Sequence, residues 1–321
     1  MSRQFLSKEN AGIIAAFGAV YILWGSTYLG IKYAIETIPP FIMAGSRFLI
    51  AGSILCVWAL RKGSVKLTWA DLKQFAIISI LLLVIGNGGV VIAEKYIASG
   101  MTALLITIEP VWVVLIQMAK GKKPDIKVWI GMILGFTGMF ILIGPSGIGG
   151  LEQVNLFGFL LIMISTFSWA AGSVYSSGQS RNISPLLSTG IQMLIAGVIF
   201  SSTAWGVGEY QTFELSKVST NSMLALIYLI VCGSLIGFTC YIWLIKASTP
   251  GKVSTYAYIN PVIAVILGIY IGGETVNSQI LIATPILVLA VILILLQKEI
   301  KFPEKGRIRI LEITRIKKKC A

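Results

Sequence analysis

The chain of 321 residues is strongly apolar, with 56% hydrophobic residues, only 12% charged residues and a formal net charge of +13. This composition leaves too little polar surface to cover a soluble domain, so it predicts an all-α polytopic membrane protein. The basic residues flank apolar segments, and their excess therefore indicates membrane topology. We expect no nucleic-acid partner.

Ten apolar segments have about 20 residues each, which is the length that a helix needs to cross a hydrocarbon core of about 30 Å. Backbone polar groups must be paired within lipid, so we expect each segment to form a transmembrane helix. The ten segments are 11–33, 38–60, 72–92, 97–118, 127–144, 155–177, 187–206, 222–245, 253–272 and 278–297.

The second half of the chain resembles the first after a shift of 151 residues. Ile108-Glu109-Pro110-Val111 then falls on Ile259-Asn260-Pro261-Val262, and Lys95 falls on Lys246. A duplicated unit with an odd number of spans enters the membrane upside down in its second copy, as in many transporters. We therefore expect a cytoplasmic N-terminus at 1–10, inverted five-helix repeats at 11–144 and 155–297, an external linker at 145–154 and a basic cytoplasmic tail at 298–321.

The lysine and arginine residues are sorted by side of the membrane. With ten helices and a cytoplasmic N-terminus, 22 of the 26 lie in cytoplasmic stretches, three lie outside and Arg47 lies within a helix. By the positive-inside rule, we expect a multi-pass protein of the cell (inner) membrane with both termini in the cytoplasm. The basic tail is interpreted as a topology determinant, with binding of membrane lipid as the alternative.

Residue types that carry enzymatic chemistry are scarce. The chain has no histidine, and its four cysteines have neither metal-binding nor redox spacing. This removes the commonest general base and metal ligand together. We expect no catalytic residue, no metal and no cofactor, so the protein is not predicted to be an enzyme.

Two charged residues lie deep within predicted helices, where ionisable groups need a partner or a water-filled cavity. Glu109 is about twelve residues into the fourth span, and Arg47 is nine residues into the second. One interpretation is an ion pair that clamps two helices of the first repeat. The other is that Glu109 binds a proton or a cationic substrate during transport, and the sequence leaves both open.

Prolines follow Glu109 and Asn260 at matching positions of the two repeats. Because proline lacks a backbone donor and disfavours helix in the residue before it, Pro110 and Pro261 predict helix breaks near the middle of the membrane. Paired breaks of this kind are typical of a substrate site, and packing kinks are the alternative. Asn260 is therefore a candidate for substrate contact.

Aromatic residues away from the helix ends are candidates for the wall of a cavity, with core packing as the alternative. They are Trp24, Tyr28, Trp169, Tyr175, Tyr256 and Tyr258, of which the last two cannot share one helix face. Asn87 stands among three glycines and is a candidate gating residue. The sixth span also carries a polar run that predicts a wetted wall: Ser168, Ser173, Ser176, Ser177 and Gln179.

Several of these motifs together resemble the paired EamA modules of the drug/metabolite transporter superfamily. They are Trp24-Gly25-Ser26-Thr27, Arg47-Phe48, Glu109-Pro110, Tyr258-Ile259-Asn260-Pro261-Val262 and Gly272-Gly273-Glu274, although Lys122-Lys123 replaces the last motif in the first repeat. The resemblance covers about residues 10–297. It implies ten helices in inverted repeats and secondary transport through a central cavity, often export of amino acids, other metabolites or toxic compounds.

We therefore expect a secondary transporter that exports a small organic molecule by alternating access, with a proton or another ion as the coupling species. A structural or sensory membrane protein, whose basic tail binds lipid or a partner, is the alternative. The substrate, the direction of transport and the choice between a monomer and a homodimer stay open.

Overall fold

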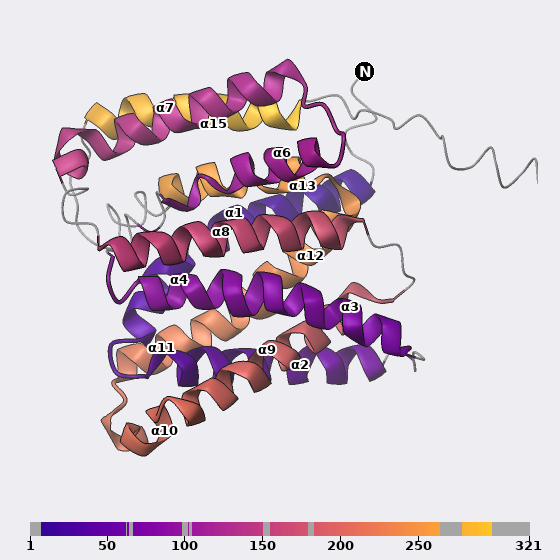
Figure 1. Ribbon diagram of the computed structural model, residues 1–321, viewed down its shortest axis with the longest axis vertical. Helices are drawn as coiled ribbons and strands as arrows, with labels where there is room; N and C mark the ends of the chain where they lie inside the picture. Colours follow the sequence, from indigo (N-terminus) through magenta and orange to yellow (C-terminus); the bar gives the residue numbers. More distant parts are fainter. Residues whose placement is uncertain are drawn as a thin grey trace, which may run out of the picture.

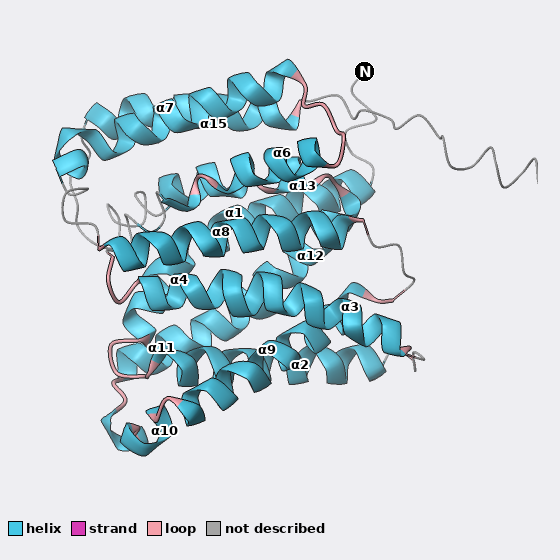
Figure 2. Cartoon of the chain, in the orientation of Figure 1, coloured by secondary structure: helices cyan, strands magenta, loops and turns pink. Residues whose placement is uncertain are grey.

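The computed structural model describes residues 8–61, 63, 67–97, 102, 105–149, 155–178, 183–263 and 278–296. All regular structure in these ranges is helical (Figure 2). Several predictions lie outside the described residues, namely those on Gly272-Gly273-Glu274, Gln179, the second half of the linker at 150–154 and the tail at 298–321. The first half of the predicted linker, 145–149, is helical.

In the first half, the long apolar runs form helices that begin and end close to the predicted spans. Thr68 caps the third of these runs. Its side chain accepts a hydrogen bond from the Asp71 backbone amide, and the Asp71 side chain accepts one from the Thr68 backbone amide. The elements are α1 (Lys8–Ala34), α2 (Pro40–Arg61), α3 (Trp69–Ser79), the π-helix η2 (Ile80–Asn87), α4 (Gly88–Ala93), α6 (Glu109–Ala119) and α7 (Ile126–Gly149).

The second half repeats this order with additional short helices. The elements are α8 (Leu156–Ser177), α9 (Pro185–Gly206), α10 (Glu209–Thr212), the 3-10 helix η4 (Leu215–Lys217), α11 (Thr220–Tyr228), the π-helix η5 (Leu229–Phe238), α12 (Thr239–Ala247), α13 (Pro250–Val253) and α15 (Ser278–Leu295). Residues 256–263 are also helical.

Six helical stretches of the described chain are long and apolar enough to cross a membrane: Ala11–Ala34, Pro40–Arg61, Trp69–Ala93, Leu156–Ser177, Pro185–Gly206 and Thr220–Ala247. Shorter apolar helices cover Glu109–Ala119, Ile126–Gly138 and Ile282–Leu295. The protein is therefore a multi-pass membrane protein. The predicted fourth and ninth spans include residues outside the described ranges.

The helices lie side by side in a row, with α7 against α15 at one edge and α2, α9 and α10 at the other (Figure 1). Glycines allow α2 and α9 to approach closely. A Cβ atom on Gly52 would lie 2.8 Å from the Gly190 carbonyl oxygen, and one on Gly197 would lie 2.8 Å from the Leu49 backbone nitrogen. Small residues at such positions are typical of helix pairs in membranes.

The π-helices η2 and η5 occupy the middle of two long spans, each between two α-helical segments. Their wider turns offset backbone carbonyls, which neighbouring side chains then reach. Ser168 donates to the Leu81 carbonyl at 2.8 Å, and Trp24 donates to the Gly233 carbonyl at 3.2 Å. Side-chain hydrogen bonds thus join η2 to α8 and η5 to α1.

The two prolines lie in different surroundings. A turn at 107–108 precedes α6, which begins at Glu109 with Pro110 in its first turn, where proline leaves no hydrogen bond unmade. By contrast, residues 256–263 are helical through Pro261, and the turn in that segment lies at 254–255. The predicted break at Pro261 is therefore displaced to 254–255. The Ala257 amide bonds the Ser254 carbonyl at 3.1 Å, so the helix restarts before the proline.

Candidate functional site

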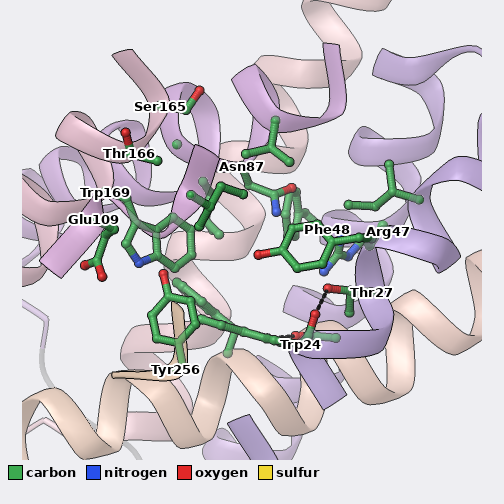
Figure 3. Close-up of a pocket in the computed structure, with 18 residues that line it drawn as sticks. Trp24, Thr27, Arg47, Phe48, Asn87, Glu109, Ser165, Thr166, Trp169 and Tyr256 are labelled. Atoms are coloured by element: carbon green, nitrogen blue, oxygen red, sulfur yellow. Dashed lines mark hydrogen bonds between the residues drawn. The ribbon is translucent and has the colours of Figure 1, made fainter. Parts of the chain in front are cut away.

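A cavity lies among the helices of both halves of the chain, and the empty space between its lining atoms, including the part that is open to solvent, is about 670 Å³. Its walls come from α1, α2, η2 and α4 in the first half and from α8 and η5 in the second, while Glu109 of α6 and Tyr256 close its sides (Figure 3). Apolar and aromatic walls with a few polar side chains are typical of a site for a small organic ligand.

Glu109 and Arg47 both line this cavity and are both buried. The Arg47 guanidinium donates through Nε to the Ser234 hydroxyl at 2.8 Å and lies 5.0 Å from the ring centroid of Phe48, but its Nη1 has no hydrogen-bond partner. Neither carboxylate oxygen of Glu109 has a hydrogen-bond partner among the described residues.

The two charges do not pair with each other. They lie on opposite sides of the cavity, Glu109 beside Trp169 and Arg47 beside Thr27 (Figure 3). The ion pair of the helix-clamp interpretation is therefore absent from the described part of this structure. A buried charge without a partner is costly, and such charges in membrane proteins face substrate or ion pathways.

Four rings form an aromatic box, which we define as Trp24, Trp169, Tyr241 and Tyr256. The Trp24 ring centroid lies 4.8 Å from that of Tyr241, 5.2 Å from that of Tyr256 and 5.4 Å from that of Trp169. Trp169 donates to the Tyr241 hydroxyl at 2.6 Å, which fixes its ring. The box therefore presents a rigid wall to the cavity. Tyr241 was not among the predicted residues, because nothing in its sequence surroundings distinguishes it from a packed tyrosine.

Of the other predicted aromatics, Tyr28 lines the cavity and Tyr258 does not. Tyr258 is 0% exposed and packs in a separate cluster with Val262 and Leu287, against the α7 and α15 pair. This agrees with the expectation that Tyr256 and Tyr258 face different ways. Of these two candidates, Tyr256 lines the cavity, and Tyr258 therefore does not have the predicted contact with substrate.

Asn260 is buried and does not line the cavity. With its amide oriented to satisfy its hydrogen bonds, the side-chain nitrogen donates to the carbonyls of Tyr256 and Tyr21 at 3.1 Å each. The Tyr28 hydroxyl also hydrogen-bonds its side chain. Asn260 therefore holds the 256–263 helix against α1, which is a positioning role instead of the predicted substrate contact.

Asn87 lines the cavity at the end of η2, and its side-chain oxygen has no hydrogen-bond partner. The polar wall of α8 consists of Ser165 and Thr166, which were not among the predicted residues. The predicted Ser168 and Ser173 instead bond the Leu81 carbonyl and the Tyr241 hydroxyl, in contacts between helices. The spacing of Ser165 four residues before Trp169 is the one signal that could have identified this face.

The family model described as the EamA-like transporter family matches residues 10–144 and 156–296. The chain is 36% identical to the "Uncharacterized inner membrane transporter YedA" of Escherichia coli K12, over 93% of this chain and 95% of that protein.

Two further relatives are more distant. The chain is 26% identical to the "Uncharacterized transporter YvbV" of Bacillus subtilis, over 90% of this chain and 92% of that protein. It is 25% identical to "Protein PagO" of Salmonella typhimurium, over 93% and 98% of the two chains. A solved crystal structure aligns with a TM-score of 0.71 at 18% identity, over 88% of this chain and 96% of that one, and shows a shared fold.

Proposed function

This chain belongs to the EamA-like transporter family, and on that premise we propose that it is a secondary transporter that exports a small organic metabolite, amino acid or drug-like compound. The observation that carries this proposal is the cavity, which holds two buried ionisable side chains with polar atoms that have no hydrogen-bond partner among the described residues, and an aromatic wall between helices of both halves. A packed structural or sensory protein has no need to bury charges without partners.

We place the protein in the inner membrane with both termini in the cytoplasm, on the charge asymmetry of the sequence and on its similarity to an inner membrane transporter. Two five-helix repeats of opposite orientation account for the packing. The pairs α2 with α9 and α7 with α15 join equivalent spans of the two repeats. A shift of 151 residues places 80–87 of η2 on 231–238, within η5.

Transport follows if the two repeats rock about the cavity and open it to one face at a time. The aromatic box binds the apolar body of the substrate, and the Arg47 guanidinium and Glu109 carboxylate supply charged contacts. No nucleotide-binding motif is present in the sequence, so an ion or substrate gradient drives the cycle. Glu109 carries the coupling proton or cation, because neither of its oxygens has a hydrogen-bond partner among the residues that the structure describes.

The test begins with a comparison of metabolites outside cells that lack or overproduce the protein, which identifies the cargo. Gradient-driven transport of that cargo is then measured in proteoliposomes with the Glu109→Gln variant. We expect at least a tenfold loss, while Glu214→Gln, which changes an exposed loop carboxylate that pairs with Lys217, stays at the wild-type rate. Full gradient-driven transport by Glu109→Gln would contradict the coupling role of Glu109.

A further inference from the structure

A second carboxylate lies just beyond the cavity, outside the span Trp69–Ala93. Glu94 follows the last residue of α4, and Val90, four residues earlier on the same helix face, lines the cavity. The carboxylate is therefore one helical turn from the cavity, toward the face of the membrane that we assign to the outside. The mechanism above does not use it.

Helix α1 brings a matching row of residues to the same end of the molecule. Tyr28 lines the cavity, and Lys32 lies four residues further along the same face. The Lys32 ammonium acts electrostatically on Glu94, and both Glu94 and Glu109 act on the Tyr28 hydroxyl. Tyr28 is thus within electrostatic range of both carboxylates, one in the cavity and one at its end.

Glu94 has the features of an ion-binding group. Both of its oxygens are shielded from solvent, and neither has a hydrogen-bond partner in the part of the chain that the structure describes, which includes Lys32. Burial raises the pKa of the Glu94 carboxyl well above its usual range, and Lys32 opposes part of this rise. The next residue, Lys95, is exposed. Of the helices that pack against α4, α8 and η2 contain no charged residue, and α2 carries Arg47 and Arg61.

We propose that Glu94 is the external proton-binding site of the transport cycle and that it exchanges protons between the outside solution and Glu109 across the cavity. The proposal rests on the proposed transport function. One proton from the outside converts the Glu94 carboxylate to the neutral carboxyl. When the proton leaves Glu94 it converts the Glu109 carboxylate to its carboxyl, so the total charge of the two groups is unchanged by the transfer. The proton then leaves Glu109 to the cytoplasm as substrate moves outward.

The test compares two reactions of Glu94→Gln in proteoliposomes with the identified cargo. Exchange of labelled for unlabelled cargo needs no net proton movement, and we expect it to stay within about twofold of wild type. Transport driven by an imposed pH gradient is expected to fall at least tenfold. Glu94→Asp, which keeps a carboxyl group, should retain gradient-driven transport with a shifted pH dependence.

The matched control is Glu36→Gln, which removes an exposed carboxylate from the same end of the molecule and should change neither reaction. Gradient-driven transport by Glu94→Gln at the wild-type rate would overturn the proposal. Loss of exchange together with driven transport would also overturn it, because Glu94 would then be needed for passage or folding instead of coupling. If wild-type protein moved no cargo at all, the proposed transport function itself would fail.

A measurement without cargo tests the same site. Infrared titration of the wild-type protein in lipid vesicles should show protonated carboxyl absorption that persists above the pH at which exposed carboxyls ionise. Glu94→Gln should remove part of this absorption, and Glu36→Gln should leave it unchanged. An identical band in wild type and Glu94→Gln would show that Glu94 is ionised and would contradict the proposal.

Discussion

The cavity wall and the α2 and α9 interface are built by opposite rules, although α2 contributes to both. At the interface, glycines let the two backbones touch, and a Cβ atom on Gly190 would lie 2.7 Å from the Cys56 sulfur. At the cavity wall, Arg47 and Glu109 keep polar atoms without partners. One helix therefore presents a dry, close-packed face and a face with uncompensated charge.

This difference separates stability from function within a single membrane bundle. Packing and close backbone contact stabilise helix pairs in lipid, where no hydrophobic effect drives helices together. Buried charges without partners destabilise, so they persist where they serve binding or transport. Substitutions at the α2 and α9 interface should therefore lower stability more than transport activity. Substitutions at the cavity wall should lower transport activity more than stability.

The largest effect is expected from Gly52→Val at the interface. Its Cβ would lie 2.8 Å from the Gly190 carbonyl oxygen and 2.9 Å from the Leu194 backbone nitrogen, so the helices must separate. Overpacking typically costs about 1–3 kcal/mol, and we expect more here because the clash is with backbone. Thermal unfolding in detergent measures the loss. Gly18→Val, with no atom within 4 Å of the added Cβ, is the control, and equal melting of the two variants would refute the account of the interface.

Arg47→Met should have the opposite effect, with a loss of transport and no loss of stability. It replaces a buried charge with an apolar side chain of similar length, so we expect the unfolding temperature to stay the same or rise. Transport of the identified cargo should fall at least tenfold, equal to about 1.4 kcal/mol of lost interaction. A variant that is destabilised but transports normally would assign Arg47 to the scaffold.

Trp24→Phe should have the smallest effect of the three. It keeps an aromatic ring in the box but removes the 3.2 Å hydrogen bond from Trp24 to the Gly233 carbonyl of η5. A typical hydrogen bond contributes about 0.5–1.5 kcal/mol, so transport should fall by about twofold to tenfold. Trp205→Phe, which changes a residue that is 72% exposed, should leave flux unchanged. Equal flux in both variants would show that this bond does not support the cavity.

The helical framework was predictable because segment length and hydropathy decide what crosses lipid. The interruption before Pro110 follows from proline chemistry, but the turn at 254–255 depends on where the helix restarts, which no local residue indicates. The π-helices were also missed. Their extra residue per turn is stabilised by side chains from other helices, such as Ser168 on the Leu81 carbonyl.

The candidate site was predictable where chemistry alone makes a residue unusual. Glu109 and Arg47 are charged in apolar segments, and this marks them without any structure. The positions of the Tyr258 and Asn260 side chains could not be predicted, because they depend on how their helix is rotated about its axis. Packing against neighbouring helices sets that rotation. Ser165 required the same knowledge, because a serine on a membrane helix can bond its own backbone, as Ser165 also does with the Leu161 carbonyl.

Labelling of a cysteine within the cavity tests alternating access most directly. After replacement of the native cysteines, Thr27→Cys should react with a membrane-impermeant maleimide added from either face of the membrane, and cargo should slow both reactions. Ala196→Cys, which is 0% exposed on α9, should react from neither face. Reaction of Thr27→Cys from one face only, or from neither, with cargo and driving gradient varied, would contradict a cavity that opens in turn to the two sides.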